Sequence, residues 1–319
     1  MNLKTLALAL LAGATLAAQA APFPEKPVRI VVPFAPGGNV DIVNRIVAQA
    51  MGEELKQTII IENKAGANGA IGTESVARAA PDGYTLVVAV TETMALNPSL
   101  QKALPYNPLK DFTGIGIVDT FAFSLVLSNK LPPNDVKSFI AYAKERPGKL
   151  NFSSWGTGSL SQIAMEQLKQ STGIDLLHVP FKGAAPAITA VTAGSIEAFV
   201  APLSLAVPYS ADGRVKLIAV TSAERQPTAP NVPTLTEQGY PVVVTGWHVL
   251  AAPAGTPPDV IATLSRALNV ATSKPEVRDR LLKAGVTPAT STPQEAQSLI
   301  ISEHKRWGEV ARKAGIVPE

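Results

Sequence analysis

Residues 28–41 read VRIVVPFAPGGNVD, which joins a short apolar run to a glycine loop and then to a helical pattern. The run Val28–Val32 is rich in β-branched residues, which is typical of a buried parallel strand. The run breaks at Pro33, and from Asp41 onward the apolar residues recur on one helical face. The stretch therefore predicts a strand, a loop and a helix in succession.

The same succession recurs along the chain. Apolar runs predict further strands, and helical patterns follow most of them; Asn134 or Asp135 is expected to cap one helix that runs to about Arg146. This alternation favours an α/β fold with parallel sheets. Linker signals are scarce, since residues 224–233 are the only proline-rich stretch near the two-thirds point, so two interleaved lobes fit better than two consecutive domains. Strands are expected at residues 58–61, 85–90, 124–127, 150–153, 176–179, 196–200, 216–221 and 247–252.

Composition excludes several classes of protein. The 319 residues include no cysteine, which excludes disulfides, thiolate metal sites and a cysteine nucleophile. A net charge of +3 that is scattered along the chain, together with 5% aromatic residues, argues against a nucleic-acid partner. The three histidines lack metal-ligand spacing, and no serine lies in a G-x-S-x-G elbow. We therefore expect no metal, no cofactor and no catalysis.

The first twenty residues have the features of a signal peptide. Lys4 supplies the positive start, residues 5–17 supply an apolar stretch, and Ala18-Gln19-Ala20 supplies a small-x-small cleavage pattern. A buried helix and a membrane anchor are the alternatives, but the apolar stretch is shorter than the ~20 residues that a bilayer span needs. We expect cleavage after Ala20 and a soluble protein in a bacterial periplasm.

Two glycine loops are candidate anion sites. Residues 36–39 lie between a buried strand and a helix, where backbone N–H groups and the helix N-terminus attract a carboxylate or a phosphate. A tight turn with Asn39 as the N-cap and Asp41 opposite the helix dipole is an equally good interpretation. Residues 154–159 repeat the pattern, and two such loops at the carboxyl ends of strands would hold an anion from both sides.

Two side chains near these loops have open interpretations. Trp155 is either a pocket wall or a packing anchor, and Glu92 is either a pocket acid or an exposed residue.

Many ordered blocks of the chain resemble one family. Residues 23–38, which read FPEKPVRIVVPFAPGG, together with Asp41 and Arg45, are similar to the opening of the substrate-binding proteins of tripartite tricarboxylate transporters, the Bug family. Further matches are ENKAGA at 62–67, APDGYTL at 80–86, HVPFKG at 178–183 and APAGTP at 252–257.

The resemblance implies a type II periplasmic-binding-protein fold, in which two α/β lobes are joined by two crossover strands and hold the ligand in a cleft between them. By this analogy residues 21–118 and 246–319 form lobe 1, and residues 119–245 form lobe 2. A protein of this kind acts as a monomer, captures a small organic carboxylate and delivers it to membrane transporter subunits. A ligand-sensing module for a membrane sensor kinase and, less favoured, an exported hydrolase are the alternative functions.

The resemblance also implies the ligand-binding positions. Family members hold the ligand with loops from both lobes, through backbone N–H groups, hydroxyls and ordered waters. The matching positions are Phe34, Ala35, Pro36, Gly37, Gly38, Asn39 and Asp41 in the first loop, and Thr91, Glu92, Thr93, Ser154, Trp155, Gly158, Ser159, Lys182, Gly183, Ala201, Pro202 and Leu203 in the facing loops.

Three positions depart from the family pattern. Gln162 stands where many relatives have a histidine, Ala201 where many have an aspartate, and Glu92 where small or hydroxyl residues are usual. The missing acid at Ala201 removes a partner for a ligand amine or hydroxyl, and Glu92 is its candidate replacement. Phe34 and Trp155 are candidates for stacking on a flat acid, so the expected ligands include aromatic and amino-acid-like carboxylates.

Overall fold

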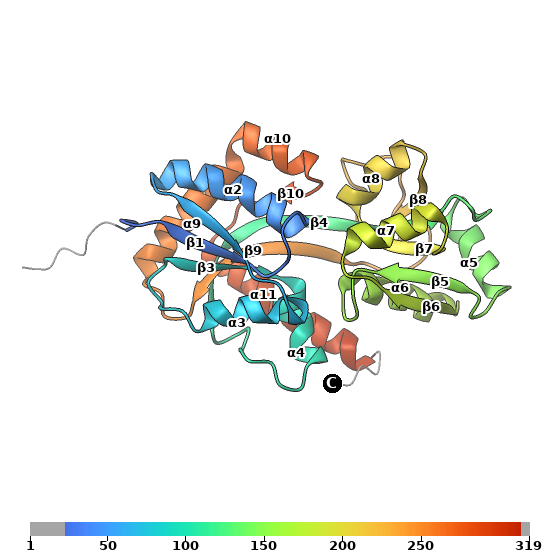
Figure 1. Cartoon of the computed structure of the whole chain (residues 1–319), viewed down its shortest axis with the longest axis horizontal. Helices are drawn as coiled ribbons and strands as arrows, with labels where there is room; N and C mark the ends of the chain where they lie inside the picture. Colours follow the sequence, from blue (N-terminus) through green and yellow to red (C-terminus); the bar gives the residue numbers. More distant parts are fainter. Residues whose placement is uncertain (1–22, 314–319) are drawn as a thin grey trace, which may run out of the picture.

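The computed structural model describes residues 23–313, so the predicted signal peptide at residues 1–20 lies outside the described part. Two α/β lobes lie side by side, and two long strands, β4 (Phe112–Ser128) and β9 (Thr245–Pro253), run between them (Figure 1). This is the two-lobed α/β class that the sequence predicts. Within residues 23–313, no helix is both long enough and apolar enough to cross a membrane.

The first lobe contains both ends of the described chain. Its elements are β1 (Val28–Val32), α2 (Asn39–Leu55), β2 (Ile59–Asn63), α3 (Ala70–Ala77), β3 (Thr85–Val90), η2 (Glu92–Leu96), α4 (Asn97–Leu100), α9 (Pro258–Ser273), α10 (Pro275–Lys283), β10 (Thr287–Pro288) and α11 (Pro293–Lys313). The strand order is β2-β1-β3-β9-β4. One apolar core lies under α2, α9 and α10, and a second lies under α3 and α11 on the other face (Figure 1).

The second lobe repeats this architecture. Its elements are α5 (Val136–Lys144), β5 (Leu150–Ser154), α6 (Leu160–Thr172), β6 (Leu176–Pro180), α7 (Ala184–Ala193), β7 (Ala198–Pro202), α8 (Leu203–Ala211) and β8 (Val215–Val220). The strand order is β4-β7-β5-β6, and β8 also pairs with β4. The core under α5 and α6 and the core under α7 and α8 lie on opposite faces of this sheet.

The crossover strands make both sheets mixed. The sequence predicts parallel sheets, and β1 does pair in parallel with β2 and β3, but β4 and β9 are antiparallel to their neighbours. Over residues 112–122 β4 pairs with β9, and over 123–128 it pairs with β7 and β8. The sequence predicts a strand only at 124–127, whereas β4 already begins at Phe112. The register of β4 against β9 shifts between Gly114 and Gly116 and between Ile117 and Asp119, as at β-bulges.

The C-terminal helix α11 contacts the cores of both lobes. Trp307 is fully buried in a cluster that includes Phe123 and Leu168 of the second lobe as well as Leu96 of the first. Its indole N–H donates a hydrogen bond of 2.9 Å to the carboxylate of Glu303. The end of α11 therefore packs where the two lobes meet.

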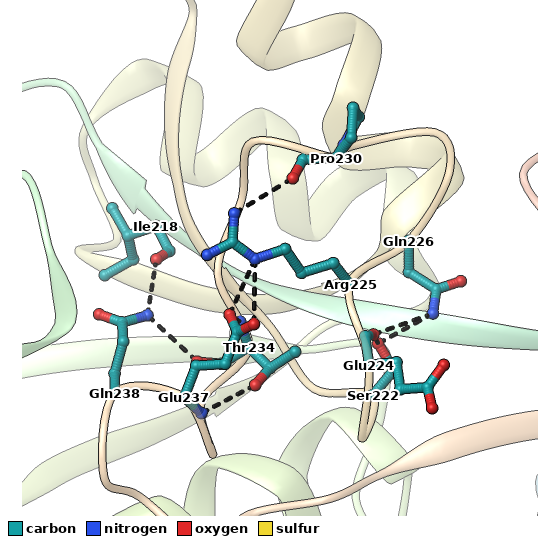
Figure 2. A network of polar contacts seen from close by, with 9 residues as sticks. All are labelled: Ile218, Ser222, Glu224, Arg225, Gln226, Pro230, Thr234, Glu237 and Gln238. Atoms are coloured by element: carbon teal, nitrogen blue, oxygen red, sulfur yellow. Dashed lines mark hydrogen bonds and ion pairs between the residues drawn. The ribbon is translucent and has the colours of Figure 1, made fainter.

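The loop from β8 to β9 returns the chain to the first lobe, and a polar network holds it in place (Figure 2). The carboxylate of Glu237 accepts hydrogen bonds of 2.9 Å from the Thr234 N–H and from Nε of Arg225. These bonds, that of the Thr234 N–H first, lower the pKa of Glu237. The side chain of Gln238 donates to the carbonyl of Ile218 in β8 at 3.3 Å. The network therefore joins Arg225, near the start of the proline-rich residues 224–233, to Glu237 after their end, and Gln238 holds that end to β8.

A capping box begins α5, and a substitution of its aspartate tests how much this cap stabilises the protein. The Oδ1 atom of Asp135 accepts the Ser138 N–H at 2.8 Å, and the Ser138 hydroxyl lies 3.3 Å from the Asp135 N–H. We expect Asp135→Ala to lower the free energy of unfolding by about 1 kcal/mol, because the first turn loses its cap. Urea denaturation measures this change. Asp135→Ser is the matched control, because serine restores a capping oxygen; a deficit as large as that of alanine would contradict the assignment.

Candidate functional site

The first glycine loop leads into a helix N-terminus that no side chain caps. Gly38 is the N-cap of α2, with φ −79°, and no side chain bonds to the first turn from that position. Gly37 has φ +82°, a conformation that glycine adopts without strain. Ala35, Pro36, Gly37 and Gly38 are all exposed. The first turn of α2 therefore follows an exposed loop and has no side-chain cap, and the helix end carries partial positive charge there.

Asp41 holds this loop together from within the fold. Asp41 is 4% exposed, and its carboxylate accepts hydrogen bonds of 2.9 Å from the Gly37 N–H, 3.0 Å from Nε of Arg45 and 2.9 Å from the amide of Asn63. Burial opposes ionisation of this carboxyl, but the bonds from Arg45, Gly37 and Asn63 together lower its pKa below the usual value. Asn63 also donates to the carbonyl of Phe34 at 3.1 Å. Asp41 thus positions the loop with its own hydrogen bonds.

We expect Asp41→Asn to lower the free energy of unfolding by about 1–2 kcal/mol, because the charge-assisted bond with Arg45 is lost. The pKa of Asp41 is lowered in the folded state, so its contribution is complete above the unfolded value of 3.8 and is lost as the pH falls through the folded value. Urea denaturation of wild type and variant at pH 7 and at pH 3 measures this. Asp279→Asn, at an exposed carboxylate, is the control. A deficit that does not shrink at low pH would contradict the assignment.

Asn39 connects the two lobes. One interpretation of the sequence makes Asn39 the N-cap of α2, and this is wrong, because Gly38 is the N-cap and Asn39 is the first helical residue. The amide of Asn39 instead donates a hydrogen bond of 3.3 Å to the hydroxyl of Ser204, in the first turn of α8. A Cβ on Gly285, in the first lobe, would clash with Ser204 as well. The N-termini of α2 and α8 thus meet where the lobes touch.

The second glycine loop differs from the first because its own side chains occupy its donors. Ser159 is the N-cap of α6, and its hydroxyl accepts the Gln162 N–H at 3.4 Å. The side chain of Gln162 accepts the Gly158 N–H at 2.8 Å, and the Ser154 hydroxyl accepts the Gly156 N–H at 3.2 Å. The resemblance in sequence between the two loops therefore does not extend to their hydrogen bonding.

Trp155 has aromatic neighbours on two sides. Its ring stacks on Phe123 with the centroids 5.4 Å apart, and it meets Phe199 edge-on at 6.3 Å. Trp155 is only partly buried and lies against the cores on both faces of the second lobe. These contacts are those of the packing anchor that the sequence left as one of two interpretations.

The other predicted positions of the second lobe follow β6 and β7. Gly183 precedes α7 with φ +121°, and Pro202 precedes α8; neither helix has a side-chain cap. Lys182 is exposed, whereas Ala201, Pro202 and Leu203 are buried. Ala201 lies in the core under α7 and α8. Its carbonyl accepts the hydroxyl of Ser124.

Glu92 is a buried acid of the first lobe. The chain turns at η2 directly after β3, and Glu92 is only 8% exposed, so the exposed interpretation is wrong. Burial raises the pKa of its carboxyl. The polar groups around it, its own backbone N–H first, and the nearby His248 oppose this rise. Glu92, a predicted site residue, is therefore a buried carboxyl at the start of η2.

The threonines beside Glu92 are fully buried and differ in their partners. The hydroxyl of Thr93 donates to the carbonyl of Val90 at 3.2 Å, while the hydroxyl of Thr91 has no hydrogen-bond partner among the described residues. The side-chain oxygen of Asn39 is likewise buried without a partner in the described part of the chain. Buried polar atoms normally have partners, so these two oxygens are positions that a ligand or a water would satisfy.

The sequence did not single out a buried pair next to Glu92. Nδ1 of His248, on β9, lies 2.8 Å from a carboxylate oxygen of Asp119, on β4, and both side chains are fully buried. Burial raises the pKa of Asp119, although His248 opposes this. The ring of Phe121 lies 4.9 Å from that of His248. The two residues are 129 positions apart, and only the pairing of β4 with β9 brings them together, so no local pattern could reveal them.

One cavity of the first lobe lies apart from the predicted site residues. A cavity of about 1070 Å³ lies between α9 and the start of α11, lined among others by Thr113, Asn269 and Gln294. None of the predicted site residues lines it. Within residues 23–313, no three His, Asp or Glu side chains are grouped so that they could hold a metal ion.

Two α/β lobes joined by extended strands, with helix N-termini meeting where the lobes touch, define the class of type II periplasmic solute-binding proteins. Comparison with known proteins agrees with this. Residues 43–316 match the family described as tripartite tricarboxylate transporter family receptor, and the chain belongs to this family. The resemblance stated from the sequence motifs is therefore confirmed.

Relatives cover nearly the whole chain. The protein BugT of Bordetella pertussis is 32% identical over 306 residues, which are 95% of this chain and 94% of BugT. The structure of Rpa4515 of R. palustris with adipate is 30% identical with a TM-score of 0.87, covering 93% of this chain and 100% of that one. The structure of MatC from Rhodopseudomonas palustris with bound malate is 35% identical with a TM-score of 0.82. It covers 90% of this chain and 99% of that one.

Proposed function

We propose that this chain is a periplasmic solute-binding protein that captures a small organic carboxylate between its lobes and delivers it to the membrane subunits of a tripartite tricarboxylate-type transporter. The observation that carries the proposal is the uncapped N-terminus of α2, with its exposed glycines beside the contact between Asn39 and Ser204. The relatives solved with adipate and with malate support a carboxylate as the ligand. The protein acts as a monomer, and it performs no chemistry on the ligand.

The binding energy comes from donors that the fold has already oriented. A carboxylate at the start of α2 accepts backbone N–H groups that lack a side-chain cap. Each such charge-assisted bond contributes roughly 1.5–3 kcal/mol. A few of them, less the cost of closing the lobes, reach the roughly −8.2 kcal/mol of micromolar binding. The lobes close by bending β4 and β9, and the membrane subunits recognise the closed form.

We also propose the boundaries of the mature protein and of its lobes. Cleavage after Ala20 releases a chain in which residues 21–118 and 246–319 form one lobe and residues 119–245 the other. Two apolar cores of buried residues fall within the first set, and two fall within the second. A fifth core joins residues of both, including Leu96 and Trp307. Mass spectrometry of the exported protein tests the cleavage site.

A thermal-shift screen followed by calorimetry tests the function. The panel consists of aliphatic, aromatic and amino-acid-like mono-, di- and tricarboxylates, with the matching primary amides as uncharged controls. We expect at least one carboxylate to raise Tm and to bind with micromolar affinity while its amide does not. If no carboxylate in the panel binds, the proposal is wrong.

A second experiment identifies the partner. Tagged protein is incubated with solubilised membranes, with and without the carboxylate found in the screen. Recovery of transporter membrane subunits in the presence of the carboxylate supports the proposal, whereas recovery of a sensor kinase or hydrolysis of the ligand by the purified protein would contradict it.

A further inference from the structure

The two lobes are joined firmly on one side of the crossover strands, where α11 ends. Trp307 is fully buried there, in the same core as residues of α5 and α6. Arg306 donates a hydrogen bond of 2.7 Å to the carbonyl of Val243, in the loop before β9. On the first lobe, Nδ1 of His304 lies 3.0 Å from the carbonyl oxygen of Met94. Separating the lobes on this side would expose a buried aromatic ring and break these bonds.

On the opposite side, where α2, α10 and α8 lie, the start of α8 meets the first lobe through Ser204 (Figure 1). The hydroxyl of Ser204 accepts a hydrogen bond of 3.3 Å from the amide of Asn39, which directly follows the proposed anion loop. Ser204 also lies against Gly285, just after the end of α10. One hydrogen bond and one close approach are easily broken, so the lobes separate more readily on this side.

The contact at Gly285 leaves no room for a side chain. A Cβ there would clash with the Cβ of Ser204 and would lie 2.5 Å from its Cα, a backbone atom that no change of rotamer can move. Gly285 is itself held in place, because the next residue, Val286, is 2% exposed in the core under α2 and α9. An added methyl group would therefore push α8, and with it the second lobe, away from Asn39.

We propose that Gly285 is a positioning residue for ligand capture: because it has no side chain, α8 can reach the start of α2, and any side chain there holds the lobes apart. Affinity falls when the closed form is less populated, since only that form offers the ligand the donors of both lobes. The effect on affinity rests on the proposed function, whereas the separation of the lobes is measured without a ligand.

Calorimetry of Gly285→Ala against Gly173→Ala tests the effect on affinity. Gly173, the C-cap of α6, has φ +73° and Gly285 has φ +77°, so alanine suffers the same backbone strain at both, but a Cβ on Gly173 meets no atom within 4 Å. The probe is whichever of malate, adipate and benzoate binds the wild type most tightly. We expect Gly285→Ala to bind it at least about tenfold more weakly, as when extra atoms are forced into a packed contact. Gly173→Ala should stay within about twofold of the wild type.

Small-angle X-ray scattering without any acid tests the separation of the lobes directly. We expect Gly285→Ala to have a larger radius of gyration than the wild type and than Gly173→Ala. Circular dichroism and Tm confirm that each variant folds. If Gly285→Ala does not fold, Ser204→Val brings the extra atoms from α8 instead, with Ser204→Ala as its control, and the same loss of affinity and the same expansion are expected.

A double-mutant cycle with Ser204→Gly separates the contact from backbone strain. This change removes the Cβ that alanine at position 285 would meet, although the Cα of residue 204 stays close. We expect the loss of affinity caused by Gly285→Ala to be smaller in the Ser204→Gly background. Strain at a positive φ would cause the same loss in both backgrounds.

The outcomes distinguish this proposal from the function beneath it. If Gly285→Ala binds as tightly as Gly173→Ala, if its loss is the same in both backgrounds, or if its radius of gyration is unchanged, the proposal is wrong and the proposed function stands. If the wild type binds none of the acids, the proposed function fails, and the scattering comparison alone decides whether Gly285 sets the approach of the lobes.

Discussion

Gly38→Asp is expected to weaken carboxylate binding by at least about 100-fold while leaving the fold intact. Gly38 has the extended backbone of an N-cap, so aspartate can adopt this conformation and accept an N–H of the first turn of α2. The same carboxylate would take the donors proposed for the ligand and would repel its charge. Loss of two charge-assisted bonds of about 1.5 kcal/mol each corresponds to this factor.

Two measurements make this prediction specific. Calorimetry with the best acid of the screen gives the affinity, and urea denaturation should show stability that is unchanged or higher by a few tenths of a kcal/mol, because aspartate is the better cap. Gly38→Ala is the matched control, since its Cβ would meet only the Ala35 carbonyl oxygen, at 3.8 Å. The alanine variant should keep most of the affinity. If the aspartate variant binds as tightly as wild type, the loop is a structural turn and the ligand binds elsewhere.

Trp307→Ala is expected to lower the free energy of unfolding by about 3–5 kcal/mol, the usual cost of removing a fully buried aromatic side chain. The indole fills the cluster between the lobes and donates to Glu303 at 2.9 Å. Its loss leaves a cavity and deprives that largely buried carboxylate of one partner. Trp247 remains as the other donor to the same oxygen of Glu303, at 3.4 Å.

Urea denaturation at pH 7 measures this loss. Ile301→Ala, on the same helix but 49% exposed, is the control and should change stability by less than about 0.5 kcal/mol. Trp307→Phe keeps most of the packing but not the donor, so it separates the two contributions. A loss below about 1 kcal/mol in Trp307→Ala would mean that the end of α11 is not part of the core between the lobes.

Local patterns in the sequence predicted most of the individual elements. The strand expected at 85–90 is β3 with the same bounds, and Asp135 caps α5 as one of the two expected residues. These features depend on residues that are neighbours in the chain, such as an apolar run or a side chain that bonds to the next turn. The family also followed from ordered motifs along the chain, and the comparisons confirm it.

In the candidate site, the sequence predicted the first glycine loop better than the second. The first glycine loop was located correctly as a strand-to-helix connection with exposed backbone. For the second loop the sequence suggested equivalent free donors, whereas Ser154, Ser159 and Gln162 occupy several of them. Whether a side chain turns back onto its own loop depends on rotamers and neighbours, which a glycine pattern does not specify.

The sequence by itself thus determined the class of fold, the family, the position of most strands and helices, and the position of the glycine loop where we propose that an anion binds. Only the tertiary structure decided that β4 belongs to both lobes, that Trp307 of the last helix packs between them, and that His248 and Asp119 form a buried pair. The physical reason is the range of the interactions. Periodicity and capping act over a few residues, whereas strand register, burial and the charge around a carboxyl depend on residues that only folding brings together.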